Sequence, residues 1–224
     1  MKKIFLILLL TATAFANIGT VMAVNGQAQV KRAKKMLYVK NGMTLLKGDE
    51  IITKTKTKVQ VILNDDTAIT IGPNSSFHFI DYMFDGSKKS KISMQATRGF
   101  FRSVTGKIGK IAPERFKVKT NLATIGIRGT DFSVQLEKNK ASYLCNSGEI
   151  KVSFNNKVRN ILAGDMLRLH LDGLTIKESP ISNIHSGSTF QKRIPKQQLT
   201  DNLSDISEVK EDINDIQYDC QHDR

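Results

Sequence analysis

Hydrophobic residues recur at every second position in much of the chain. The period is clear in residues 59–63, 116–120, 132–136, 150–154 and 167–171. This is the period of β-strands that bury one face. Turn-forming Asn, Asp, Gly and Pro residues separate these runs. Short strands divided by closely spaced turns predict an all-β domain over residues 24–180, built as an antiparallel sandwich or barrel.

The N-terminal segment has a different pattern. Two lysines follow Met1, and no further charged residue occurs before Lys31. The apolar run contains Ala14–Ala16 and Val21–Ala23, each with the small residues that a signal peptidase accepts, so residues 1–23 predict a secretory signal peptide. We expect cleavage after Ala23, with Ala16 as the second site. An uncleaved inner-membrane anchor is the alternative, because the run is about long enough to span a bilayer. Either way, the body of the chain is expected to be periplasmic or secreted.

The C-terminal part divides into two segments. Residues 181–198 are rich in Ser, Lys, Gln and Gly, which predicts a linker. In residues 199–224, apolar residues recur at steps of three and four, which predicts an acidic amphipathic helix with its N-cap near Thr200 or Asp201. The stripe consists of Leu199, Leu203, Ile206, Val209, Ile213 and Ile216. We interpret it as a helix docked on the body; a coiled-coil or partner-binding segment is the alternative.

Charge is distributed unevenly along the chain, whose net charge is +13. Residues 24–180 hold 27 basic and 13 acidic residues, whereas residues 181–224 hold 5 basic and 8 acidic residues. Export makes nucleic acid an unexpected partner for this basic body. The chain also has no Trp and only four Tyr, so it lacks the aromatic stacking typical of nucleic-acid binders.

Candidate catalytic groups are few. The chain has two Cys and four His, too few for a disulfide-dense scaffold or a Cys-rich zinc site. None of them shows a metal-binding or nucleophile–base spacing, so we predict no enzyme, no cofactor and no small-molecule substrate. A disulfide between Cys145 and Cys220 is compatible with export, although an inward Cys145 is poorly placed for it. A free Cys220 that pairs between molecules is the alternative.

Six motifs follow one another in the body. They are Gly48–Thr53, Gly72–Ser75, Gly99–Arg102, Phe116–Thr120 with Ile127–Val134, Gly148–Val152 and Leu162–Asp165. In this order they resemble the FecR-type periplasmic domain, over roughly residues 40–170. The resemblance implies an all-β sandwich of jelly-roll type that senses signals or contacts proteins in the bacterial envelope. The best-known members relay a signal from an outer-membrane iron–siderophore receptor to a cytoplasmic sigma factor. Only three residues precede the apolar run here, so we expect no sigma-factor-binding domain.

Folding explains why most of these residue types occur in the motifs. Glycines between strands allow positive φ, and Thr130 can bond the backbone of a turn. We predict structural roles for Gly48, Asp49, Thr53, Gly129, Thr130, Phe132, Gly148 and Gly164. Many relatives have Gly where this chain has Asp66, so we expect a longer hairpin or another turn type there. Arg128 is the exception: it forms an ion pair with Asp131 or Asp49, or it is an exposed recognition residue.

Dense runs of basic residues suggest a surface for anionic partners. We expect Lys54, Lys56 and Lys58 to share one face of a strand. Lys117 and Lys119 are expected to share one face of another strand. The candidate interaction residues are Lys54, Lys56, Lys58, Lys107, Lys110, Lys117, Lys119 and Arg128. The sequence therefore predicts a non-enzymatic envelope protein that binds another protein in signalling or surface assembly. A module that binds anionic glycan or lipid head groups is the alternative, and a hydrolase is the third hypothesis.

Overall fold

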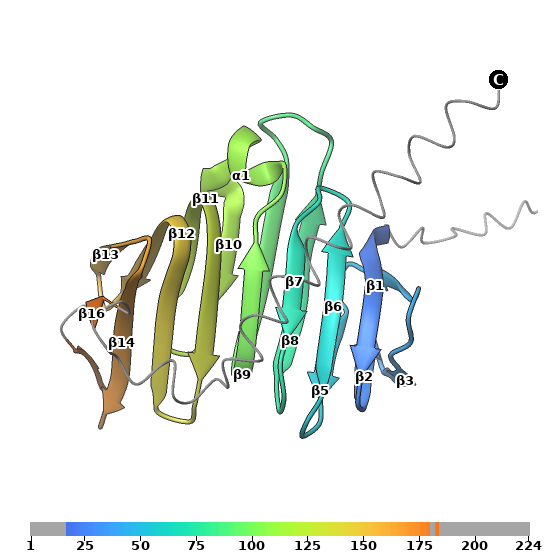
Figure 1. Ribbon diagram of the computed structural model, residues 1–224, viewed down its shortest axis with the longest axis horizontal. Coiled ribbons are helices and arrows are strands. Elements are labelled where there is room, and N and C mark those ends of the chain that lie inside the picture. Colours follow the sequence, from blue (N-terminus) through green and yellow to red (C-terminus); the bar gives the residue numbers. More distant parts are fainter. Residues whose placement is uncertain (1–16, 180–181, 184–224) are drawn as a thin grey trace, which may run out of the picture.

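The computed structural model describes residues 17–179 and 182–183, of which about two-thirds lie in β-strands. One short α-helix, α1 (Ile108–Ile111), and one 3-10 helix, η1 (Pro113–Arg115), interrupt the strands. The prediction of an all-β sandwich is confirmed (Figure 1). The sixteen strands are β1 (Asn17–Asn25), β2 (Ala28–Arg32), β3 (Lys35–Tyr38), β4 (Thr44–Leu46), β5 (Glu50–Thr53), β6 (Lys58–Leu63), β7 (Ala68–Ile71), β8 (Ser76–Met83), β9 (Lys91–Val104), β10 (Phe116–Lys119), β11 (Thr124–Leu136), β12 (Lys140–Phe154), β13 (Lys157–Leu162), β14 (Asp165–Asp172), β15 (Thr175–Glu178) and β16 (Ser182–Asn183).

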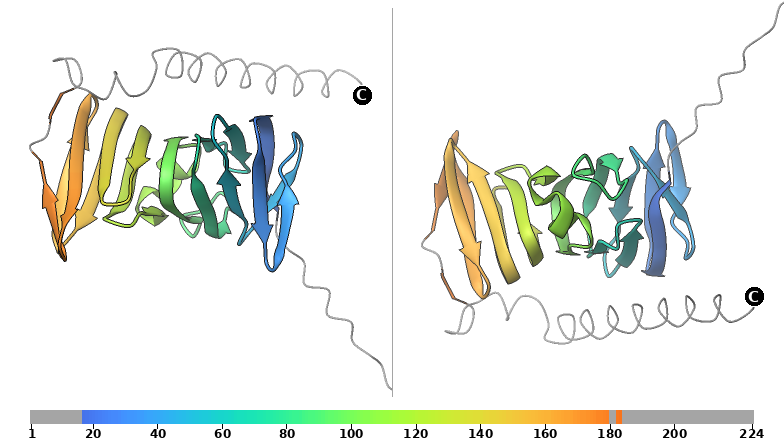
Figure 2. Two further views of the ribbon diagram at one scale, coloured as in Figure 1. Left: turned by 90° about the horizontal axis from the view of Figure 1, so that it is seen from below. Right: turned by 90° about the horizontal axis from the view of Figure 1, so that it is seen from above.

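All strands belong to one continuous sheet that folds over into two layers. The first layer has the order β15–β14–β12–β11–β9–β7–β6–β1–β4. The second has the order β13–β12–β11–β10–β9–β8–β5–β2–β3. The strands stand side by side along the long axis, from β14 at one end to β1–β3 at the other (Figures 1 and 2). The pairs are antiparallel, as expected, except that β9 and β10 run parallel.

Three long strands, β9, β11 and β12, belong to both layers. The first half of β11 pairs with β10 in the second layer, and its second half pairs with β9 in the first. Each of the three strands contains a glycine with positive φ where it passes between layers: Gly99 at 85°, Gly129 at 59° and Gly148 at 76°. Only glycine adopts this conformation cheaply, so these residues let one strand serve both layers.

The core lies between the layers and has an aromatic centre. Phe101 packs edge-on against Phe77 and Phe132, with ring centroids 5.1 and 6.0 Å apart. All three rings are essentially inaccessible to solvent. They come from β8, β9 and β11, so the ring contacts bridge the two layers and stabilise them by burying apolar surface. The inward face predicted for Val59, Val61 and Leu63 is likewise buried.

The sheet begins earlier than the sequence pattern suggested. β1 starts at Asn17, lies between β4 and β6, and buries Ile18 and Val21 completely. A β domain that starts at residue 24 would lack most of this strand, so that expected boundary is wrong for the sheet. The expected linker at 181–198 lies outside the described residues except for β16, and the expected helix at 199–224 lies wholly outside them.

Candidate interaction surface

An open groove of about 550 Å³ lies on the outer face of the second layer. Its residues come from strands β10, β11, β12 and β13 and from the neighbouring η1. They are Pro113, Glu114, Phe116, Lys117, Thr124, Gly126, Ile127, Arg128, Glu149, Lys151, Ser153 and Asn160.

Strand register places the outward groove residues in rows. One row crosses four strands: Lys117 is opposite Gly126, which is opposite Lys151, which is opposite Asn160. Gly126 contributes no side chain to this row. A Cβ atom built on it would have only atoms of Lys151 within 4 Å, both at 4.0 Å. The groove therefore lies where one side chain is missing from the middle of a row.

Arg128 stands in the next row, opposite Glu149. Its side chain is 83% exposed, and its Nη1 lies 4.0 Å from the Glu149 carboxylate. An ion pair this open contributes little to stability. The two expected partners are engaged elsewhere, since Asp131 binds Arg102 and Asp49 binds Arg32. The expected ion pairs of Arg128 are therefore wrong, and its guanidinium faces solvent beside the groove.

Two predicted candidates, Lys117 and Lys119, lie exposed on the same outer face as Arg128. Lys151 joins them from β12, although the sequence reasoning did not single it out. A signal was available: Lys151 stands between the buried Ile150 and Val152, and alternation therefore turns it outward. The structure thus places four cations on this face, and three of them, Lys117, Arg128 and Lys151, line the groove together with Glu114 and Glu149.

The other candidate lysines lie elsewhere. Lys54 and Lys56 belong to the turn between β5 and β6, where Lys56 has a positive φ of 54°; only Lys58 is in a strand. The expectation that these three share one strand face is therefore wrong. Lys107 pairs with Asp66 at 3.0 Å, and Lys110 is in α1. Figure 1 shows α1 at the opposite rim from the β5–β6 turn, so the eight candidates do not form one patch.

Most of the predicted structural residues have the contacts of a scaffold, but the expected bond from the Thr130 hydroxyl to the backbone is wrong, because this buried hydroxyl has no hydrogen-bond partner. Asp49 is fully buried and accepts hydrogen bonds from Arg32 at 2.8 and 2.7 Å. The Thr53 hydroxyl donates to the Gly72 carbonyl at 2.7 Å and accepts from the Ser75 amide at 2.8 Å. Phe132 is part of the core. The predicted motif glycines all have positive φ: Gly48, Gly129, Gly148 and Gly164.

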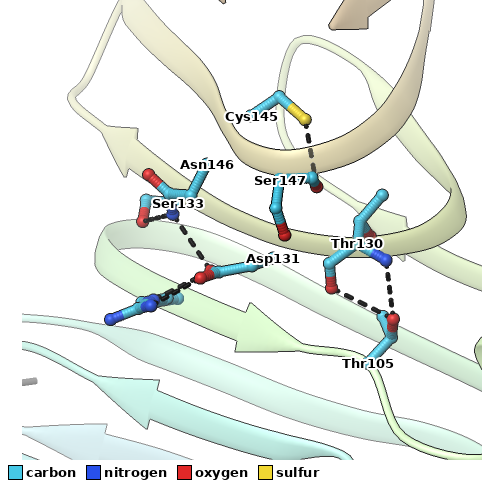
Figure 3. Close-up of polar contacts among 8 residues, drawn as sticks. Thr105, Thr130, Asp131, Ser133, Cys145, Asn146 and Ser147 are labelled. Carbon is cyan, nitrogen blue, oxygen red and sulfur yellow. Dashed lines mark hydrogen bonds and ion pairs between the residues drawn. The ribbon is translucent and has the colours of Figure 1, made fainter. Parts of the chain in front are cut away.

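A polar network supports the crossing of β11 between the layers (Figure 3). Arg102 Nε donates to Asp131 at 2.8 Å, and the Asn146 amide donates to the same carboxylate at 3.0 Å. The Thr130 amide donates to the Thr105 hydroxyl at 2.8 Å, which in turn donates to the Thr130 carbonyl at 3.0 Å. The two Thr130 bonds satisfy backbone groups next to the bend at Gly129, and the bonds to Asp131 hold the buried Arg102 side chain.

The hairpin between β6 and β7 contains a buried carboxylate. Asp65 is fully buried, and burial raises its pKa above the ordinary value. Its carboxylate accepts a hydrogen bond from the Thr67 hydroxyl at 2.6 Å and a longer one from the Ile108 amide of α1 at 3.4 Å. The neighbouring Asp66 has a φ of 65°, the left-handed conformation that glycine adopts most cheaply. Asp65 thus links the hairpin to α1 and has no access to solvent.

Cys145 lies in the core, as its inward position predicted. Its thiol is fully buried and donates to the Ser147 carbonyl at 3.4 Å (Figure 3). Burial raises the pKa of this thiol to about 11, which keeps it protonated and unreactive. Cys220 lies outside the described residues, so the disulfide stays a prediction.

The described residues hold neither a helix of membrane-spanning length nor a cluster of potential metal ligands. No helix among them is long and apolar enough to cross a membrane. No cluster of three or more His, Cys, Asp or Glu side chains in residues 17–179 is arranged to hold a metal ion.

Comparison with known proteins supports the resemblance found in the sequence. Residues 49–151 match the family model described as FecR protein, which confirms the resemblance over this part of the chain. No curated protein matches the chain. Two crystal structures of a candidate anti-sigma factor from Parabacteroides distasonis, at 2.50 and 1.65 Å resolution, are 17% and 16% identical, each with a TM-score of 0.47.

The overlap with these structures is partial. The alignment covers 58% of this chain and 58% of each Parabacteroides chain. A structure described as a cell surface anchoring domain is 22% identical with a TM-score of 0.27, and the alignment covers 27% of this chain and 82% of that one.

Proposed function

We propose that this chain is a non-enzymatic, periplasmic protein whose FecR domain binds an acidic segment of another envelope protein in signalling or surface assembly. The observation that carries the proposal is the groove over Gly126, with Lys117, Lys151 and Arg128 around it. Cations on long side chains around a concave site attract carboxylates and orient a bound segment.

The surroundings of the groove favour a protein ligand. Val158 and Leu162 of β13 are 49% and 57% exposed. They stand opposite Ser153 and Glu149, which puts them on the same outer face as the groove. Exposed apolar side chains beside cations match a segment that carries both acidic and apolar residues. Anionic glycan or lipid head groups, the alternative ligands, would use the cations but not the apolar pair.

The groove also lacks histidine, the commonest general base in hydrolysis. Its hydroxyl side chains are those of Thr124 and Ser153, and none of its residues is His, Cys or Asp. A serine or threonine nucleophile requires a positioned base. We therefore propose a binding role without catalysis.

Photocrosslinking in native cells tests the proposal. A photoreactive amino acid replaces Asn160 in the groove wall of the full chain, and Leu174, fully exposed in the β14–β15 turn, provides the matched control position. We expect a protein adduct from position 160 that position 174 does not give. Gly126→Phe should abolish the adduct by filling the groove, whereas Gly126→Ala should retain it because a Cβ atom fits there. Absence of a position-specific protein adduct, or an adduct with lipopolysaccharide alone, would contradict the proposal.

A further inference from the structure

We propose that signal peptidase cuts the exported chain after Ala16, so that the mature protein begins at Asn17. Ala14 and Ala16 supply small residues at the third and first positions before this bond, as signal peptidases require. The competing bond after Ala23 has Val21 and Ala23 at the same positions. The sequences around the two bonds are similar. Cleavage at one bond would preserve strand β1, whereas cleavage at the other would remove most of it.

A cut after Ala23 would remove most of β1, an inner strand near one end of the first layer. β1 has 9 residues, and only Val24 and Asn25 would remain of it. This strand pairs with β6 on one side and with β4 on the other. Without it, β6 would become a free edge, β4 would lose the strand it pairs with, and the core would be open where Ile18 and Val21 are now fully buried. Uncovered edges and exposed core are what folded β proteins avoid.

A cut after Ala16 would leave the strand complete. Asn64 binds the very start of β1: its side-chain amide donates to the Asn17 carbonyl at 2.9 Å, and its backbone amide donates to the Ile18 carbonyl at 3.1 Å. The Asn17 side chain accepts a hydrogen bond from the Gly19 amide at 2.9 Å. The first residue after Ala16 is therefore already part of the sheet.

The sequence around the second bond is explained by the packing of β1 in the sheet, without a role in cleavage. A Cβ atom on Gly19 would lie 2.4 Å from the Ile62 carbonyl oxygen and 2.8 Å from Leu63 Cα, so β1 and β6 approach closely there. Val21 points into the core, and the ladder shifts register between Val21 and Ala23. Packing therefore accounts for Val21, one of the two residues that make the second bond resemble a cleavage site.

N-terminal sequencing and intact-mass measurement test the inference. The full chain, produced from its own start with a C-terminal tag in a bacterial host, is recovered from the envelope fraction. We expect the mature chain to begin Asn-Ile-Gly-Thr. The same substitution at each candidate bond gives a matched pair: Ala16→Gln should cause the precursor to accumulate, whereas Ala23→Gln should leave the N-terminus at Asn17. A mature chain that begins at Val24, or a wild-type chain that keeps its N-terminal segment, would overturn the inference.

A folding measurement tests the same inference independently of export. Chains 17–224 and 24–224 are produced without the apolar segment, and their thermal unfolding is compared. We expect a cooperative transition for chain 17–224, and loss of that transition or a much lower midpoint for chain 24–224. Equal midpoints would show that β1 is dispensable and would overturn the structural argument.

Discussion

Two arginines near the bend of β11 have opposite environments. The Arg102 side chain is 6% exposed and its guanidinium is held by the Asp131 carboxylate, which also binds Asn146. The Arg128 side chain is 83% exposed and approaches one carboxylate only at 4.0 Å. A buried charge depends on its partner, because losing the partner leaves it without solvent or counterion. The first arginine therefore serves the fold, and the second is free to serve recognition.

This contrast gives a prediction about stability. Asp131→Ala should destabilise the domain by about 3–5 kcal/mol, since it leaves a buried guanidinium unpaired. Arg128→Ala should change stability by less than about 1 kcal/mol, the usual contribution of an exposed pair. Urea denaturation of both variants measures the difference. Similar losses in the two variants would contradict the roles assigned to these arginines.

At the scale of elements, the bends of β9, β11 and β12 are the features on which the two-layer fold depends. Gly148 combines a φ of 76° with close packing, since a Cβ atom on it would lie 2.2 Å from the Gly129 carbonyl oxygen. The obstacle is backbone, which cannot rotate away as a side chain can. The bends of β11 and β12 are therefore packed directly against each other.

Gly148→Ala should accordingly destabilise the domain by about 3 kcal/mol, from left-handed backbone strain together with overpacking. Gly126→Ala is the matched control in the neighbouring strand, because its added Cβ meets nothing closer than 4.0 Å. That control should be neutral or stabilising by up to about 1 kcal/mol, since alanine is favoured over glycine in a strand. Thermal unfolding of both variants decides the matter, and an unaffected Gly148→Ala protein would show that the bend tolerates a side chain.

Strands were easier to predict from the sequence than their arrangement. Alternation located the buried faces around Val59 and Phe132, because one-sided burial leaves a period of two. The same reasoning treated Gly129 and Gly148 as turns between strands, whereas each lies inside one long strand that changes layer. Glycine is typical of both situations, so local sequence does not separate them.

The groove could be predicted only in part, because it depends on the arrangement of the strands as well as on their sequences. Alternation turns Lys117 and Lys151 outward, but their proximity depends on the order β10–β11–β12–β13. That order is set by pairing between distant parts of the chain, which a single sequence does not reveal. The empty place at Gly126 likewise becomes a groove only when long side chains stand on both sides of it.

At the scale of the whole molecule, charge connects the described domain with the rest of the chain. Residues 199–224 contain eight acidic and two basic residues, a net charge of −6. The last described strand, β16, pairs with β14 at the end of the molecule that also holds β13 (Figure 1). The described part of the chain therefore ends near β13, whose Asn160 lines the groove. We expect the acidic segment, residues 199–224, to cover part of the basic face and to compete with other anionic ligands.

Deletion of residues 199–224 should then increase binding to anionic surfaces. Co-sedimentation with vesicles that contain phosphatidylglycerol measures it at low salt, where exposed charges interact over about 30 Å at 0.01 M. We expect the shortened chain to bind several-fold more strongly than the full chain, and the difference to disappear at high salt because both attractions are screened. Adding Lys117→Ala and Lys151→Ala to the deletion should remove the gain, which would assign it to the groove rather than to net charge alone. Equal binding by the full and shortened chains would mean that the acidic segment does not cover this face.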